Sequence, residues 1–223
     1  MKKDVIQAIV FDAYGTLFDV QSIAAKINVF FPGKGEEISK TWREKQLEYA
    51  NLRQLMGIYR PFSVVTKDAL RYAVKKHGCR LDETAERALL HAYLDLEIFP
   101  EVQNVLMKLR HKRLVVFSNG SHDMLDPLVN SSGIAGLIND ILSADDVQMY
   151  KPTPASYDYA AHRLRLAREN ILFVSSNGWD ISGAKNYGFR TAWINRQHLP
   201  VEELNLPPDG IYPDLNGLLE WTM

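Results

Sequence analysis

The most constraining feature of this sequence is an alternation of short apolar segments with helical segments, which one long helical stretch interrupts. Residues 5–11 (VIQAIVF) are apolar and rich in β-branched side chains, as expected of a buried parallel strand. From Asp19 to Pro100 the pattern is helical, and no convincing strand occurs in that interval. The alternation resumes after Pro100. The chain is therefore predicted to begin a sheet, leave it for a helical excursion, and return to it.

The individual helices and strands are predicted from hydrophobic periodicity and from the residues that end each periodic segment. Glycine, proline and polar clusters separate the segments, and apolar residues at spacings of three to five mark a helix face within residues 36–56. Strands are predicted at residues 5–11, 114–117, 141–142, 171–175 and 191–194. Helices are predicted at residues 36–56, 63–76, 82–96, 101–110 and 154–166, with another beginning at about Asp180.

Repeated strand–helix units imply a mostly parallel sheet that is covered on both faces. We therefore predict an α/β fold with a Rossmann-like core and an inserted all-helical cap domain. The core would comprise residues 1–17 and 99–223, and the cap residues 18–98. A chain of 223 residues exceeds the roughly 150 residues of a typical single domain, which fits a core with a substantial insertion.

The composition narrows the classes of partner. Lys and Arg number 26 and Asp and Glu 27, a formal net charge of −1, whereas nucleic-acid binders usually carry a strong basic excess. The single cysteine, Cys79, cannot form an internal disulfide, which fits a reducing compartment. The N-terminal segment reaches Asp12 before it builds a signal-peptide core, and no apolar run approaches the roughly 18 residues that span a bilayer. We expect a soluble, cytoplasmic protein that binds neither nucleic acid nor membranes.

Polar side chains stand where three of the predicted strands end. Asp12 follows the first strand, Ser118 and Asn119 follow the second, and residues 175–177 close a later one. Ligands of such α/β folds bind at the carboxyl ends of the strands, so these side chains are expected to converge on one crevice. Polar side chains are also common at ordinary strand ends, so none of these residues identifies a site by itself.

Three further positions have both an ordinary and a chemical interpretation. Asp12 is suited to act as a nucleophile, a metal ligand or a helix cap. Lys151 precedes a proline that holds the chain extended, and most lysines are simply solvated. Asp180 opens the last predicted helix and could be no more than its N-cap.

Taken together, these positions resemble the four motifs of the haloacid dehalogenase superfamily, and the resemblance covers essentially the whole chain. Those motifs here are Asp12 with Thr16, Ser118-Asn119-Gly120, Lys151-Pro152, and residues 175–180 (SSNGWD). Residues 11–19 (FDAYGTLFD), 42–49 (WREKQLEY) and 175–180 further resemble the type II, L-specific 2-haloacid dehalogenases. That resemblance implies hydrolysis of short-chain L-2-haloalkanoic acids to 2-hydroxyalkanoic acids with inversion.

The residues present support this branch on chemical grounds. Superfamily phosphatases carry a second acid two residues after the nucleophile, where this chain has Tyr14, and a halide leaves without needing a proton. They also bind Mg²⁺ with paired acids, where this chain has Ser176 and Asp180. A lysine about 4 Å from a carboxylate contributes up to about 4 kcal/mol at an effective dielectric near 20, so Lys151 could replace the metal. We expect neither a metal ion nor another cofactor.

The resemblance also assigns roles to residues. The Asp12 carboxylate would attack the halogen-bearing carbon to form an ester, and water would then attack the Asp12 carbonyl and release the product. Catalytic roles fall on Asp12, Thr16, Arg43, Ser118, Lys151, Tyr157, Ser175, Asn177 and Asp180. Substrate-binding roles fall on Tyr14, Arg43, Leu47, Phe62, Lys67, Ser118, Asn119 and Trp179, with Arg43, Asn119 and Phe62 holding the halide.

Several of these assignments have plain alternatives. Arg43 could be an exposed helix residue, and the aromatic and leucine side chains could be ordinary core. Tyr157 could pack inward from its helix. Ala13 and Gly178 differ from the commonest family residues and leave the chain-length preference open. A Mg²⁺-dependent phosphatase of the same superfamily and a catalytically silent binding module are the competing functions, and the family makes a homodimer plausible.

Overall fold

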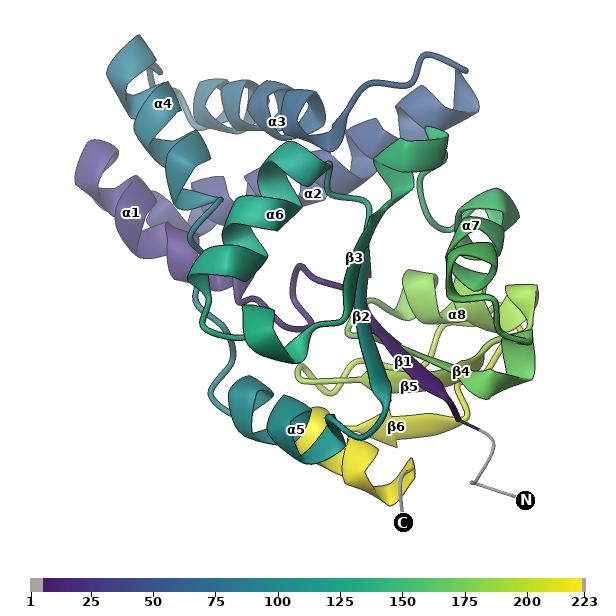
Figure 1. The fold of residues 1–223 in the computed structure, drawn as a ribbon. Helices are drawn as coiled ribbons and strands as arrows, with labels where there is room; N and C mark the ends of the chain where they lie inside the picture. The colour runs from purple at the N-terminus through teal and green to yellow at the C-terminus, as the bar shows by residue number, and fades with distance from the viewer. Residues whose placement is uncertain (1–5, 222–223) are drawn as a thin grey trace.

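The computed structural model describes residues 6–221, and its strands form one parallel sheet (Figure 1). The order across the sheet is β3-β2-β1-β4-β5-β6, and each neighbouring pair is parallel. The strands are β1 (Ala8–Phe11), β2 (Arg113–Ser118), β3 (Asp140–Ser143), β4 (Ile171–Ser175), β5 (Arg190–Ile194) and β6 (Gly210–Tyr212). The predicted mostly parallel sheet is confirmed.

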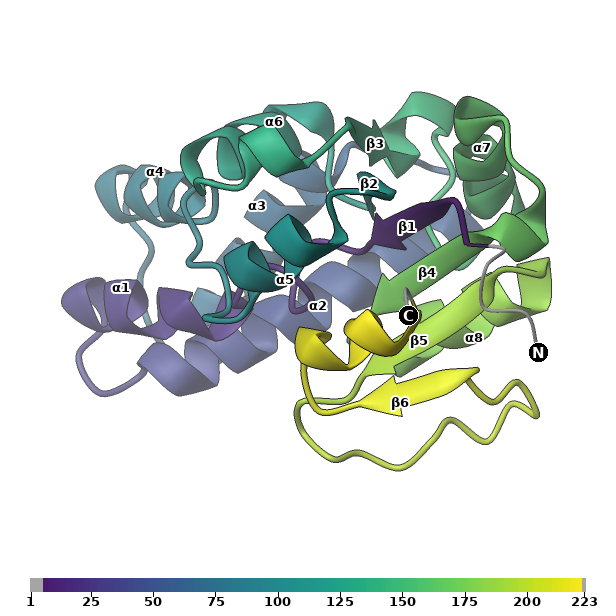
Figure 2. The same ribbon diagram turned by 60° about the horizontal axis from the view of Figure 1, so that its bottom comes forward.

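The predicted strands differ from the observed ones mainly at their ends. The first strand was predicted from residue 5, which lies outside the described residues, and β1 begins only at Ala8. The sequence-based prediction missed β6, a three-residue strand that forms an edge of the sheet (Figure 2). No residue of β6 is fully buried, so it lacks the apolar run that marks the inner strands.

Helices cover both faces of this sheet. Helices α7 (Pro154–Leu164) and α8 (Gly178–Tyr187) lie on one face, and α6 (His122–Ser131) and α5 (Val102–Leu109) on the other, α5 packed beside the C-terminal 3-10 helix Leu215–Trp221 (Figure 1). Between these layers β1 is fully buried along its length. The central position of β1 places its carboxyl end, and so Asp12, in the middle of the molecule.

The helical excursion between β1 and α5 forms the inserted cap. It comprises α1 (Ile23–Phe30), α2 (Gly35–Leu55), α3 (Phe62–Lys76) and α4 (Glu83–Ala92), which lie beyond the carboxyl end of the sheet (Figure 1). No described residue in this stretch belongs to a named strand, as predicted. Helix α4 stops at Ala92, four residues earlier than predicted, and α1 and the core helix α6 were not predicted.

The two passages between core and cap are tied together. The amide of Phe99, on the returning passage, donates to the carbonyl of Leu17, on the outgoing one, at 3.1 Å. Arg196, after β5, donates to the carbonyl of Thr16 at 3.1 Å and forms an ion pair with Glu101 at 2.6 Å. The cap is therefore anchored beside the loop that follows Asp12. In the described part of the chain, no helix is both long and apolar enough to cross a membrane.

Candidate active site

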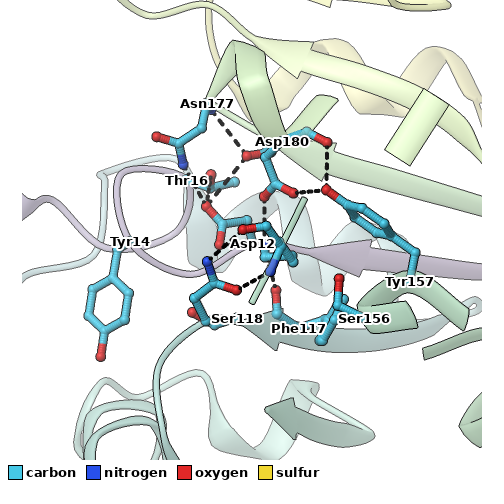
Figure 3. Close-up of polar contacts among 12 residues, drawn as sticks. Asp12, Tyr14, Thr16, Phe117, Ser118, Ser156, Tyr157, Asn177 and Asp180 are labelled. Carbon is cyan, nitrogen blue, oxygen red and sulfur yellow. Dashed lines mark hydrogen bonds and ion pairs between the residues drawn. The ribbon is translucent and has the colours of Figure 1, made fainter. Parts of the chain in front are cut away.

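Polar side chains from neighbouring strand ends meet at the carboxyl edge of the sheet (Figure 3). Asp12 follows β1, Ser118 ends β2 and Ser175 ends β4, and β1 pairs with both of the others. Lys151 reaches the same place from the loop before α7, and Asp180 from the first turn of α8. The structure therefore confirms the predicted convergence.

Lys151 lies between two carboxylates. Its ammonium group is 3.0 Å from Asp12 Oδ1 and 2.6 Å from Asp180 Oδ2, and it also donates to the carbonyl of Phe117 at 3.2 Å. The side chain is 1% exposed, against 7% for Asp12 and 0% for Asp180. The three ammonium protons are thus all used, and the cation is fixed in position.

These charges control the ionisation of the cluster. Burial lowers the pKa of Lys151, but the negative charges of Asp12 and Asp180 outweigh burial and raise that pKa, so the group remains an ammonium ion. Burial also raises the pKa of Asp180 to about 6, while Lys151 opposes that rise. At neutral pH Asp180 is therefore a carboxylate beside a charged Lys151.

The second carboxylate oxygen of Asp12 is held by neutral donors. Asn177 Nδ2 donates to Oδ2 at 2.8 Å, and the hydroxyls of Thr16 and Ser175 lie 3.3 and 3.4 Å from the same atom. The Thr16 hydroxyl also accepts from the amide of Ser176 at 2.8 Å, which links the β1 and β4 loops. Asp12 is therefore oriented through both of its oxygens.

The hydroxyl of Tyr157 positions the Asp180 side chain. The Tyr157 hydroxyl donates to Asp180 Oδ1 at 2.7 Å and lies 3.1 Å from the Asp180 carbonyl oxygen. Burial, and then the charge of Asp180, raise the pKa of Tyr157 well above its usual value. The alternative reading of Asp180 as a helix cap is wrong, because α8 begins at Gly178 and Asn177 is its N-cap residue.

Asn119 and Ser118 organise the loop after β2. The Asn119 side chain accepts from the Lys151 amide at 2.7 Å and donates to the Lys151 carbonyl at 3.2 Å. The Ser118 hydroxyl accepts from the amide of Gly120 at 3.1 Å. Asn119 thus fixes the backbone of Lys151 and keeps one amide proton for a ligand.

A cavity of about 310 Å³ opens beside this cluster, between α2 and the core. Arg43, one turn before Leu47 on α2, is half-buried, and its guanidinium lies 3.4 Å from the carbonyl of Tyr14. The cap therefore brings a cation over the loop that follows Asp12. The residues that line the cavity are Leu47, Glu48, Ala50, Asn51, Asn119, Lys151, Pro152 and Trp179.

Comparison with known proteins agrees with this geometry. The family model of haloacid dehalogenase-like hydrolases matches residues 6–188. The chain belongs to this family. It is 44% identical over 219 residues to an (S)-2-haloacid dehalogenase of Pseudomonas sp. (strain YL), covering 97% of this chain and 94% of that protein. It is 43% identical over 221 residues to haloacetate dehalogenase H-2 of Moraxella sp. (strain B), covering 98% of each.

Solved structures of L-2-haloacid dehalogenases have the same fold. One, 45% identical, superposes with a TM-score of 0.94 and covers 97% of this chain and 98% of its own. Another, from Xanthobacter autotrophicus and 37% identical, has a TM-score of 0.92 over 97% of this chain and 98% of its own. It was determined with chloropropionic acid covalently bound. The predicted resemblance to the L-specific branch of this family is confirmed.

The donor set of this haloacid dehalogenase-like hydrolase does not fit a magnesium ion. Mg²⁺ takes oxygen ligands in octahedral geometry, commonly one or two carboxylates together with several waters. Here the ammonium of Lys151 contacts both Asp12 and Asp180, and Ser176, at the place of the second acid, lies 3.2 Å from the Thr16 hydroxyl. A divalent cation at the two carboxylates would meet the charge of Lys151 directly. Among residues 6–221, no group of three His, Cys, Asp or Glu side chains could hold a metal ion.

Tyr14 and Phe62 form an aromatic layer next to the cluster. The Tyr14 ring points away from Asp12 (Figure 3) and stacks on Phe62 at 6.1 Å between ring centroids. Burial raises the pKa of Tyr14 well above its usual value, and its buried hydroxyl has no hydrogen-bond partner among the described residues. Tyr14 therefore presents no acid to Asp12, where phosphatases of the family have a carboxyl group.

The structure does not bring Lys67 to this site. Lys67 forms an ion pair with Glu86 at 3.5 Å and lines a separate cavity of about 410 Å³ between α3, α4 and α6. The sequence-based prediction instead missed Ala50 and Asn51, which line the site cavity. Their positions three and four residues after Leu47 are the signal that could have found them, because such residues share a helix face.

Proposed function

We propose that this protein hydrolyses short-chain L-2-haloalkanoic acids to 2-hydroxyalkanoic acids, with inversion, through an ester on Asp12. The observation that carries the proposal is the Asp12 carboxylate itself, held by Lys151 and Asn177, with Lys151 also lining a cavity that α2 covers. Its relatives named (S)-2-haloacid dehalogenase and haloacetate dehalogenase, and the neighbour with covalently bound chloropropionic acid, support the same reaction class.

In the first step, the Asp12 carboxylate attacks the carbon that bears the halogen. The new C–O bond forms as the C–halogen bond breaks, and the halide leaves with the electron pair. The halide needs no proton, so Tyr14 is tolerated where a phosphatase has an acid. The ordered Asp12 side chain, fixed through both oxygens, lowers the entropic cost of reaching the attack geometry.

In the second step, water attacks the carbonyl carbon of the Asp12 ester. When Asp12 Oδ1, the oxygen beside Lys151, carries the ester, Asn177 and Ser175 stabilise the oxyanion that develops on Oδ2. Asp180, whose pKa of about 6 suits a base at neutral pH, takes the proton of the water. Asp180 then returns this proton to the departing alkoxide oxygen as the acyl C–O bond of the ester breaks. The new Asp12 carboxyl group releases the second proton of the water and returns to its carboxylate form.

Substrate recognition joins core and cap. Arg43, with Asn119 and Phe62, binds the halide, while Ser118, neighbouring backbone N–H groups and Lys151 bind the substrate carboxylate. The alkyl part contacts Tyr14, Leu47 and Trp179. Lys67 is not included, because it lies in the other cavity.

The same proposal includes the organisation of the chain. Residues 1–17 and 99–223 form the catalytic core and residues 18–98 the cap, which supplies Arg43. The family resemblance is compatible with a homodimer, and a cytoplasmic location fits the lone Cys79. The reaction uses no metal ion, since Lys151 provides the positive charge beside Asp12.

The test is halide release in the presence of excess EDTA. We expect L-2-chloropropionate to release chloride under chelation, the D-isomer to be inert, and haloacetate to serve as a substrate without a chiral centre. Phosphomonoesters with added Mg²⁺ test the alternative of a phosphatase. Turnover of phosphomonoesters alone, or of no compound in either set, would contradict the proposal.

A further inference from the structure

Two hydrogen bonds join the cap to Tyr150, the buried residue that precedes Lys151. Gln54, in the last turn of α2, accepts from the backbone amide of Tyr150 at 2.8 Å. The Tyr150 hydroxyl donates to the carbonyl of Arg60, in the loop between α2 and α3, at 2.5 Å. Tyr150 is 1% exposed, so its hydroxyl would be costly to bury without this partner. The cap therefore holds Tyr150 through both its backbone and its side chain.

Two aromatic side chains of the cap pack on the same residue. The ring of Tyr59 lies 4.9 Å from that of Tyr150 between centroids, and the ring of Phe62 packs on it edge-on at 6.0 Å. The Tyr59 hydroxyl also donates to Asp145, in the core segment before Tyr150, at 2.5 Å. We call the following residues the clasp: Gln54, Tyr59, Arg60, Phe62 and Tyr150.

The core side of the clasp is fixed without the cap. Asn119 accepts from the Lys151 amide at 2.7 Å and donates to the Lys151 carbonyl at 3.2 Å. The Lys151 ammonium group is held by Asp12 and Asp180. Loss of a cap contact to Tyr150 should therefore leave Lys151 in place. The clasp positions the cap against the core, and not the core against the cap.

Helix α2 contacts the core before and after the stretch that lines the site cavity. Arg43 donates to the carbonyl of Tyr14 at 3.4 Å, and Gln54, about three turns later, accepts from the Tyr150 amide. The lining residues Leu47 and Ala50 stand between these two contacts. Because a helix moves as a rigid element, the bond at its C-terminal end also restricts where its other residues lie.

We propose that Gln54 and Tyr150 are positioning residues, and that the clasp sets where Arg43 and Phe62 lie relative to Asp12. The inference rests on the proposed function, in which Arg43 and Phe62 bind the halide as Asp12 attacks. Hydrolysis of the resulting ester uses side chains of the core alone. The clasp should therefore govern formation of the ester and not its hydrolysis. Neither Gln54 nor Tyr150 needs to touch the substrate.

The test measures the two chemical steps separately in Gln54→Met and Tyr150→Phe. Each variant removes one cap–core hydrogen bond and keeps most of the side-chain volume. With protein in excess over L-2-bromopropionate, bromide release gives the rate of ester formation, and mass spectrometry of the Asp12 peptide over time gives the rate of ester hydrolysis. We expect ester formation to slow about fivefold to tenfold in each variant, as loss of one hydrogen bond implies, and ester hydrolysis to be unchanged.

The matched controls are Gln103→Met, at an exposed position of α5, and Tyr72→Phe, at an exposed position of α3. Both should keep both rates, and melting temperatures are compared for all variants. Unchanged ester formation in Gln54→Met and Tyr150→Phe, or equal slowing of the two steps, would overturn the inference.

Hydrogen exchange tests the clasp without any substrate. In Gln54→Met, the Tyr150 amide and residues 57–62 should exchange faster than in the parent protein, whereas β1 and β4 should not change. Unchanged exchange at these positions would overturn the inference by itself. A parent protein that forms no ester would instead contradict the proposed function, and the exchange result would still decide whether the clasp holds the cap.

Discussion

The two sides of the site are built differently. On the core side, Lys151, Asp12 and Asp180 are almost completely buried, and the ammonium lies 2.6–3.0 Å from both carboxylates. On the cap side, Arg43 is half-buried and its hydrogen bond to the carbonyl of Tyr14 is 3.4 Å long. The core thus has its charges in place before a substrate arrives, whereas the cap cation retains donors for a ligand.

This difference follows from how each side is attached to the sheet. Asp12 and Ser175 end neighbouring parallel strands, so the sheet register fixes their separation. Arg43 is placed by the packing of α2 and by the two chain segments that join the cap to the core. Arg196 ties these segments to the core through its hydrogen bond to the carbonyl of Thr16. The preorganised side suits the nucleophile and the ester intermediate, and the looser side suits a halide that must bind and leave.

The largest effect is expected at the core nucleophile. Asp12→Asn keeps the shape of the side chain but removes the attacking carboxylate, so turnover should fall by at least about ten-thousandfold. Chloride release from L-2-chloropropionate measures it. Asp19→Asn, at the N-cap of the short helix after the same loop, is the matched control and should retain activity. Normal turnover by Asp12→Asn would show that Asp12 is not the nucleophile.

The next effect concerns the central cation. Lys151→Met leaves Asp12 and Asp180 buried without their partner, so the free energy of unfolding should fall by about 3 kcal/mol or more and activity by at least about a hundredfold. Urea unfolding at pH 7 and chloride release measure the two losses. Lys40→Met removes an exposed lysine of α2 and should leave both quantities unchanged. A stable, active Lys151→Met protein would show that the core side is not organised around this charge.

The pH dependence of activity tests the role of Asp180. Its pKa of about 6 means that activity should decline as the pH falls below about 6, where the carboxylate becomes protonated. The Tyr157 hydroxyl hydrogen-bonds the ionised form and so lowers that pKa. Tyr157→Phe should therefore move the acid limb of the kcat profile to higher pH, by about one unit.

The matched control for this profile is Tyr159→Phe. Tyr159 lies on the same helix and donates to Asp146 instead of to the cluster. Its variant should keep the acid limb of the parent protein. A limb that does not move in Tyr157→Phe would mean that another group controls the pH dependence.

The smallest effect is expected at the cap wall of the cavity. Leu47→Ala enlarges the cavity at a lining position. The ratio of kcat/KM for 2-chlorobutanoate to kcat/KM for L-2-chloropropionate should therefore rise by up to about tenfold, the effect of about one methylene. Leu52→Ala, an exposed leucine on the same helix, is the control and should leave the ratio unchanged. An unchanged ratio in Leu47→Ala would show that the alkyl part of the substrate does not bind in this cavity.

The same division governs what the sequence could predict. Residues at strand ends, such as Asp12 and Ser175, were predicted correctly to meet, because parallel strands bring their carboxyl ends to one edge. Helix periodicity placed Arg43 and Leu47 on one helix, but not over a given loop, since the sequence does not encode how an inserted cap packs on its core. Lys67 shows the consequence: its helix was predicted well, yet its side chain faces Glu86.

Other features were hidden for local reasons. The short edge strand β6 lacks a buried apolar run, and α6 contains Pro127, which is unusual inside a helix. The start of α8 at Gly178 could not be separated from a start at Asp180, because helix ends are set by capping geometry within one or two residues. Gln54 and Tyr150 lie far apart in the chain, so no spacing in the sequence links them.

A single-turnover reaction in heavy-oxygen water tests the central claim, that Asp12 is the nucleophile. With protein in excess over L-2-chloropropionate, the substrate forms the ester through an Asp12 oxygen, and water then adds its oxygen to the Asp12 carboxyl carbon. We expect mass spectrometry to find one heavy oxygen in the peptide that contains Asp12 and ordinary oxygen in the hydroxyl of the 2-hydroxypropionate. Heavy oxygen in the product hydroxyl, with an unlabelled Asp12 peptide, would mean that water attacks the substrate directly and would contradict the account.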